Sequence, residues 1–158
     1  MKAAEGVGQQ RKKLFDLYDE VLLDGFLKAC IRKRVNSITN RDITFMVDGE
    51  EIEEIKKLTK TSFFRNFITE LMNSKFYGHS LIEMNWPSMG GELKGWTKLV
   101  DRRHVKPRFG IVTVQSHDLH GVDYREEPWS RVSIEAGEDE EMGDLLEVAQ
   151  YVLSLIHI

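Results

Sequence analysis

The densest group of chemically useful side chains lies between residues 102 and 108. Five of these seven residues can carry a positive charge: Arg102, Arg103, His104, Lys106 and Arg108. Arginine binds phosphate through two parallel hydrogen bonds, so such a loop could hold the backbone of a nucleic acid. Lysine and arginine are also the ordinary residues of a solvated surface. We therefore treat Arg102, Arg103, Lys106 and Arg108 as candidate phosphate contacts, beside the simpler interpretation of a solvated connection whose charges meet acids of the same fold or of a neighbour.

A second group offers atoms that bind metals. His117 and His120, with Asp123 nearby, provide a histidine pair, but zinc needs three or four converging ligands. The H-x-x-H spacing lacks the glutamate of the HExxH helix motif and falls in a predicted loop. Glu83 lies on a predicted strand and could act as an acid or base, yet no partner carboxylate is identifiable. A metal-dependent enzyme is therefore the weaker alternative, and we predict no catalytic residues, no metal and no cofactor.

Other motifs of known chemistry are missing from the sequence. There is no phosphate-binding loop, dinucleotide fingerprint, nucleophile elbow or EF-hand pattern. The single cysteine, Cys30, excludes an intrachain disulfide and a cysteine-rich zinc site, and it lies at an apolar helical position typical of a core residue. The sequence gives no positive support for enzyme chemistry.

Length and composition set the class of protein. The chain has 158 residues, of which 41% are hydrophobic and 30% are charged. This is the size of one domain with a core that needs no disulfide or metal. No secretory signal begins the sequence, and no apolar run reaches the roughly 18 residues that a membrane span needs. We expect a soluble protein made in a reducing cytoplasm.

The net charge of −4 conceals an uneven distribution. Residues 1–41 carry nine bases and five acids, whereas residues 42–55 carry six acids and no base. Residues 56–125 carry twelve bases and six acids, and residues 126–158 carry one base and nine acids. The negative net charge of the whole chain, with a pI near 5.8, argues against a dedicated nucleic-acid domain. The uneven distribution leaves room for a local anionic partner or for charge pairing between neighbouring subunits.

Hydrophobic periodicity predicts helices alternating with short strands. Helices are predicted over 12–23, 26–40, 50–60, a segment that Thr61 or Ser62 caps and Gly78 ends, and 142–156. The second of these carries Lys28, Arg32, Lys33 and Arg34 on its solvent side. Strands are predicted over 43–47, 79–86, 93–100, 111–114 and 131–135. The fold class is α+β, with amphipathic helices packed on a small, mostly antiparallel sheet.

Three regions follow from this pattern. Residues 1–13 are predicted to be a flexible arm, residues 14–136 an α+β domain, and residues 137–158 an acidic linker followed by an apolar helix. The core of the domain is predicted to lie where one apolar stripe meets the strand pair 79–86 and 93–100. That stripe consists of Phe64, Phe67, Ile68 and Leu71.

The last helix is apolar on more sides than one packing partner needs. A wide exposed apolar surface usually marks an interface. We therefore predict self-association, or packing on a following segment, through a set of apolar residues. They are Leu145, Leu146, Val148, Val152, Leu153 and Ile156.

At residues 76–86 the sequence has the form yG-x-s-x-x-E-x-x-W, read from Phe76-Tyr77-Gly78 to Trp86. This run resembles the Mu-like family of tailed-phage portal proteins. Other segments resemble the family in the same order along residues 14–153. These are Asp24–Asn40 with its basic centre, Arg41–Phe45, Phe64–Phe76, Arg102-Arg103-His104 followed by Gly110-Ile111, and Leu145–Val152.

The resemblance implies a structural role in a virus particle. A portal is a ring at the capsid vertex through which DNA is packaged and to which the tail connects. Because family members are several times longer, the resemblance implies a fragment from the wing, the peripheral α/β region of the subunit. It also implies homo-oligomers, contact with double-stranded DNA, and docking of the terminase motor and head–tail connector proteins. The location would be the virion, with the host bacterial cytoplasm during assembly, and no membrane.

Overall fold

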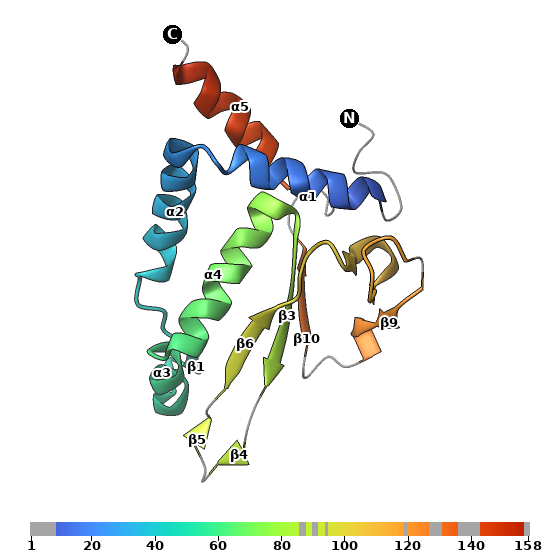
Figure 1. The fold of residues 1–158 in the computed structure, drawn as a ribbon. Helices are drawn as coiled ribbons and strands as arrows, with labels where there is room; N and C mark the ends of the chain where they lie inside the picture. Colours follow the sequence, from blue (N-terminus) through green and yellow to red (C-terminus); the bar gives the residue numbers. More distant parts are fainter. Residues whose placement is uncertain are drawn as a thin grey trace.

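The computed structural model describes residues 9–85, 88–89, 92–93, 95–118, 120–126, 131–135 and 143–156. Figure 1 shows helices and short strands in an α+β arrangement, which confirms the predicted fold class. The helices are α1 (Gln9–Val21), α2 (Gly25–Thr39), α3 (Glu53–Thr59), α4 (Ser62–Tyr77) and α5 (Leu145–Ile156). The longer strands are β3 (His79–Asn85), β6 (Trp96–Leu99) and β10 (Arg131–Glu135). The two-residue strands are β1 (Met46–Val47), β2 (Glu50–Glu51), β4 (Ser88–Met89), β5 (Glu92–Leu93), β7 (Val105–Lys106), β8 (Ile111–Val112) and β9 (Val122–Asp123).

The central sheet is antiparallel and has the order β10-β3-β6. Strand β3 pairs with β10 from Glu83 opposite Arg131 to His79 opposite Glu135, and with β6 from Ile82 opposite Leu99. Helix α4 packs on this sheet and leads directly into it (Figure 1). Gly78 makes this possible because it ends α4 in the left-handed conformation, with a φ of 79° that glycine adopts without penalty.

The first half of β3 is covered on both faces, which is why His79 to Ile82 are all buried. Ser80 faces α4, because its hydroxyl donates to the Glu70 carbonyl at 2.9 Å. Leu81 points the other way and packs with Val105 of the second, smaller sheet and with Tyr124, which follows that sheet's last strand in the 3-10 helix Tyr124–Glu126. Neighbouring residues of a strand alternate between faces, so Ser80 and Leu81 contact different layers. Strand β3 therefore joins the helical layer to the small sheet β7-β8-β9.

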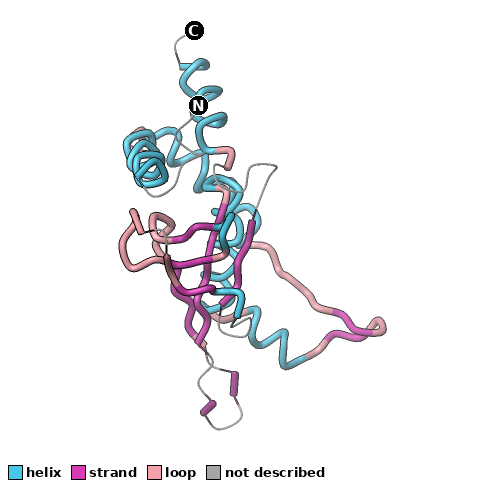
Figure 2. Tube along the Cα trace, turned by 90° about the vertical axis from the view of Figure 1, so that its right-hand side faces the viewer, coloured by secondary structure: helices cyan, strands magenta, loops and turns pink. Residues whose placement is uncertain are grey.

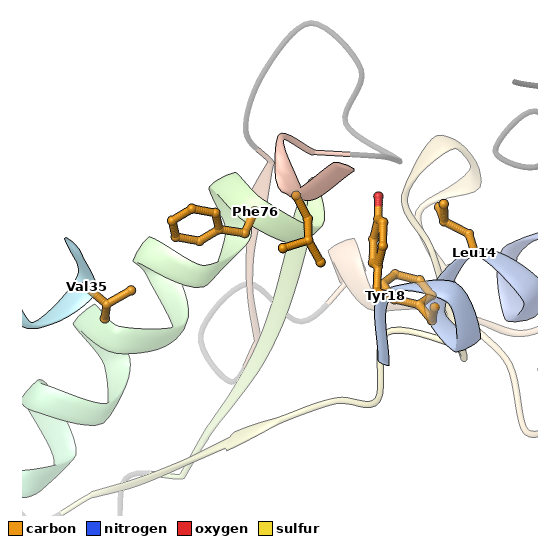
Figure 3. Packing of buried hydrophobic residues seen from close by; sticks show 6 residues of the cluster. Leu14, Tyr18, Val35 and Phe76 are labelled. Atoms are coloured by element: carbon orange, nitrogen blue, oxygen red, sulfur yellow. The ribbon is translucent and has the colours of Figure 1, made fainter. Parts of the chain in front are cut away.

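The main core lies between helices rather than between α4 and the sheet. Leu14, Phe15 and Tyr18 of α1 pack with Val35 of α2, Phe76 of α4 and Leu145 of α5 (Figure 3). Phe15 and Tyr18 meet edge to face with ring centroids 5.5 Å apart, a favoured geometry for aromatic pairs. Helix α1 begins at Gln9, so residues 9–13 are helical instead of part of a loose arm. Residues 1–8 lie outside the described part.

The core stripe predicted on α4 is wrong, because the buried residues lie at other positions around the helix. Phe64, Phe67, Ile68 and Leu71 are only half-buried, whereas Phe63 and Phe76 are buried. Phe63 approaches the sheet at Gly95, where a Cβ would lie 2.9 Å from the Phe63 ring. Phe64 instead turns toward Phe45, with ring centroids 6.1 Å apart. The apolar stripe is wide, and the sheet meets its edge rather than its centre.

The acidic segment 42–55 also differs from its prediction. The predicted strand 43–47 is reduced to β1, and the predicted helix 50–60 begins only at Glu53 because Glu50 and Glu51 pair with Val47 and Met46. Asp48 and Gly49 make the tight turn between them with φ values of 51° and 85°, as expected for an Asp-Gly hairpin turn. Figure 2 shows this hairpin extending away from both sheets.

The predicted acidic linker at 137–141 lies outside the described residues. Where the chain is described again, Gly143 fits against the end of α4, and the Asp144 N–H donates to the Lys75 carbonyl at 2.9 Å. The Lys75 ammonium also pairs with the Asp144 carboxylate at 2.9 Å. Helix α5 is therefore anchored to the C-terminal end of α4 and shares its core.

Candidate functional site

The basic segment 102–108 is the strongest sequence-based candidate, and the structure makes it a junction between layers. The Val100 N–H bonds to the Leu81 carbonyl, and the chain then turns through 101–104 into the buried strand β7. Pro107 to Phe109 form a 3-10 helix, and Gly110 follows with a φ of 68°. The expected solvated connection therefore contains a buried strand that joins the central sheet to the small one.

Arg102 points inward. Its side chain is 11% exposed, and its guanidinium donates to the His79 carbonyl at 2.9 Å and to the Ser80 hydroxyl at 2.8 Å. It also pairs with the Glu70 carboxylate at 3.3 Å and lies over the Tyr77 ring, 4.2 Å from the centroid. Burial lowers the pKa of Arg102 while Glu70 opposes this change. The Nε and Nη2 groups of Arg102 donate to residues of α4 and β3, so these donors already have partners within the chain.

Arg103 faces helix α1. Its guanidinium pairs with the Asp16 carboxylate at 3.2 Å and contacts the Asp19 carboxylate as well. Its backbone N–H donates to the Asp101 carboxylate at 2.9 Å, so the turn holds the side chain in this direction. These contacts attach the junction to α1. They match the alternative that the basic charges meet acids of the same fold.

Lys106 and His79 are buried close to other cations. Lys106 is 4% exposed, and within the described residues its ammonium has no hydrogen-bond partner. Burial lowers the pKa of the Lys106 ammonium. The Asp118 carboxylate raises this pKa, and the positive charge of Arg11 lowers it further. Burial, followed by Arg11 and Arg102, lowers the pKa of His79 to about 3. His79 is therefore neutral at physiological pH, and the positive charges near it are those of Arg11 and Arg102.

Of the four candidate phosphate contacts, Arg108 is the exposed one. Arg102 and Arg103 point to different partners on α4 and α1, and Lys106 is buried. The structure does not bring the four onto one open surface. Contact with phosphate stays a prediction that is simplest for Arg108 alone.

A different basic surface lies on helix α2. Lys28, Arg32, Lys33 and Arg34 are all exposed, as the helical periodicity predicted. No acidic residue occurs from Gly25 to Thr39, and Asp24 caps the helix by accepting from the Leu27 N–H. Lys28, Arg32, Lys33 and Arg41 line a shallow pocket along this face. We call Lys28, Arg32 and Lys33 the α2 basic face. The density of basic residues along the sequence indicates 102–108 as the basic surface, whereas their grouping by helical face indicates α2.

The predicted self-association helix is partly used by the chain's own core. Leu145 is fully buried, and Leu146 and Val148 pack against the same cluster. Val152 is half-buried and Tyr151 is 73% exposed, while the side chains of Leu153 and Ile156 lie outside the described part. Leu145 is therefore not available to contact another chain. Self-association through the outer half of α5 stays a prediction.

The histidine pair of the metal alternative is at the surface. His117 and His120 are exposed, and His117 lies 3.8 Å from the Asp118 carboxylate. Among the residues that the structure describes, no group of three or more potential ligands is placed to hold a metal ion. Over the same residues, no helix has the length and apolar character required to cross a bilayer.

The family model described as the portal protein of Mu bacteriophage matches residues 15–154. No curated protein and no solved structure matches the chain. The matched range runs from Phe15 in α1 to Ser154 in α5 and includes the central sheet and all of the main core cluster except Leu14.

Proposed function

The chain belongs to the family of Mu bacteriophage portal proteins, and on this premise we propose that it forms the wing of a portal subunit. The ring of such subunits lies at the capsid vertex, where DNA enters during packaging and the tail later connects. The observation that carries the proposal is the family match over residues 15–154. The α+β fold supports it, because the helices and the sheet share continuous packing across that range.

The proposed role is structural. Members of this family are structural proteins, and we propose that this chain binds other chains rather than a substrate. Its partners would be copies of itself in the ring, the terminase motor and the head–tail connector proteins. Double-stranded DNA would pass through the assembly. The proposed location is the portal vertex of the virion, after assembly in the cytoplasm of the host bacterium.

A genetic experiment tests this role. A stop codon in place of Tyr77 is introduced into the gene within the phage or prophage genome that carries it, and particles are collected after induction. We expect capsids without packaged DNA, and we expect a plasmid copy of the intact gene to restore DNA-filled heads. An immunogold label against the chain should then mark one vertex of each head. DNA-filled, tailed particles in the absence of the plasmid would contradict the proposal.

A further inference from the structure

The hairpin of β1 and β2 has an unusual surface for a segment at the edge of a fold. Met46 is 63% exposed and Val47 is 56% exposed, whereas Phe45, at 43%, has its ring against Phe64 of α4. An isolated two-stranded hairpin is at best marginally stable in water. Adjacent exposed apolar residues usually mark an interaction site. The hairpin extends from the body (Figure 2), so Met46 and Val47, which point to opposite faces of the strand, are both open to a partner.

The charges on the hairpin are acidic. Asp48 and Glu50 are exposed, and within the described residues neither has a salt bridge. Glu51 differs because it pairs with Lys56 at 2.7 Å, which fixes the base of the hairpin to α3. The backbone also closes the base, since the Ile52 N–H donates to the Phe45 carbonyl. The base is thus held while the acidic, apolar tip is left open.

The α2 basic face has the complementary character. Lys28, Arg32 and Lys33 are exposed, and among the described residues they form no salt bridge. Phe26, two helical turns before Lys33, is 59% exposed and adds an apolar contact beside the cations. The shallow pocket along this face runs from Gly25 to Arg41. A short hairpin with apolar residues and two carboxylates fits such a surface in charge and in polarity.

We propose that the β1–β2 hairpin of one copy docks on the α2 basic face of a second copy. The contact uses two different surfaces of the same chain, so it is heterologous, and repeated rotation can close it into a ring. The inference rests on the proposed portal function, for which it names one subunit contact. A nucleic acid on α2 would neutralise the cations but would leave the acidic, apolar hairpin uncovered. A second copy accounts for both surfaces.

Paired charge variants test the contact. Asp48→Asn/Glu50→Lys alters only the hairpin, with asparagine chosen because it tolerates the left-handed conformation at position 48, and Lys28→Glu/Arg32→Glu alters only α2. Sedimentation and light scattering follow the mass over a range of concentrations, at low and high salt. We expect the wild-type chain to associate, more weakly at high salt because the charges are screened, and each variant to associate about tenfold less strongly or worse. Lys12→Glu/Lys13→Glu, on the exposed side of α1, makes the same change in charge as the α2 variant and should leave association unaltered.

Mixing the two variants gives the sharpest result. Each keeps one intact surface, so a labelled hairpin variant should bind the α2 variant with nearly wild-type strength, although neither binds itself. Combining both variants in one chain should restore part of the association, because the charges of Glu50 and of Lys28 and Arg32 are then exchanged. A wild-type chain that stays monomeric would overturn the inference, and so would association insensitive to both variants. Association that survives in both variants, together with salt-dependent binding of duplex DNA that the α2 variant alone loses, would replace the second copy by nucleic acid.

Failure of this contact and failure of the portal role give different results. If the stop codon at Tyr77 abolishes DNA packaging while the charge variants leave association intact, the portal role holds and the hairpin contact is wrong. If particles package DNA without the gene product, the portal role itself fails, whatever the association measurements show.

Discussion

His79 shows how burial changes the chemistry of one side chain. Its ring is fully buried at the start of β3 beside Tyr124, with ring centroids 6.3 Å apart, and near the charges of Arg11 and Arg102. These surroundings disfavour the charged form, which lowers its pKa to about 3. In the unfolded chain the same ring titrates near 6.5. As pH falls below 6.5, the unfolded state therefore binds a proton that the folded state excludes.

The expected result is a loss of stability on acidification. His79 contributes no pH dependence above pH 6.5, and the loss grows as pH falls from 6.5 toward 3. Between pH 7.5 and pH 5 it amounts to about 2 kcal/mol in the free energy of unfolding. Urea unfolding at both values should show this loss, and His79→Leu should lack it. His117→Gln, an exposed control, should behave as wild type. An unchanged pH dependence in His79→Leu would show that other groups cause it.

Arg102 has a structural role that stability measurements can separate from a DNA-binding role. Because its guanidinium bonds to β3 and pairs with Glu70, Arg102→Ala leaves buried acceptors unpaired. We expect a loss of about 3 kcal/mol in the free energy of unfolding. Arg108→Ala removes an exposed charge of the same segment and should change stability by less than about 0.5 kcal/mol. Equal, small effects of both substitutions would show that the contacts of Arg102 contribute little.

At the scale of elements, the side chain that α4 buries beside the start of β6 is Phe63, whereas the predicted stripe is only half-buried. Phe63→Ala should cost about 3–5 kcal/mol, the range for a buried aromatic side chain. Phe67→Ala, on a half-buried position of the same helix, should cost less than about 2 kcal/mol. Urea unfolding of the two variants measures the difference. A larger loss at Phe67 would restore the arrangement expected from the sequence.

Gly143 controls the attachment of α5. Its φ is 63°, and a Cβ there would lie 2.1 Å from the Gly78 nitrogen and 2.6 Å from the Phe76 carbonyl oxygen. Gly143→Ala should therefore destabilise the chain by more than about 2 kcal/mol, from backbone strain and the clash together. Gly25→Ala is the matched control, because nothing lies within 4 Å of its Cβ, and it should be neutral or slightly stabilising. The melting temperatures of the two variants provide the comparison.

The sequence predicts elements better than it predicts their contacts. Apolar spacing and capping residues located α1, α2, α4 and α5, since Asp24, Thr61 and Gly78 act as the helix ends that their types favour. The hairpin was missed because Glu50 and Glu51 also suit a helix start, and only pairing across Asp48-Gly49 decides between the two. The sequence does not reveal that the 102–108 segment is partly buried, because a run of charges indicates solvent. The contacts of Arg103 with acids of α1 do match one of its alternatives. The acceptors that bind Arg102 come from residues 70–80, which are distant in sequence.

At the scale of the whole molecule, docking of the hairpin changes its exposure to solvent. Isolated copies should exchange the amide hydrogens of Met46 to Glu51 rapidly, because a short exposed hairpin opens easily. In the assembled wild type these amides should be protected. In Lys28→Glu/Arg32→Glu they should remain fast, although this variant leaves the hairpin sequence intact. Hydrogen exchange by mass spectrometry measures this directly, and slow exchange in the α2 variant would argue against docking.

The cluster of α1, α2, α4 and α5 has a consequence for how the chain folds during synthesis. Leu14 and Leu145 belong to one core, so its closure joins the two most distant described helices. Contacts of such high sequence separation slow folding. At typical translation rates roughly ten seconds pass between the synthesis of the two residues. Throughout that interval α1 exposes Leu14, Phe15 and Tyr18 to solvent, so the nascent chain is a ready client for chaperones until α5 arrives.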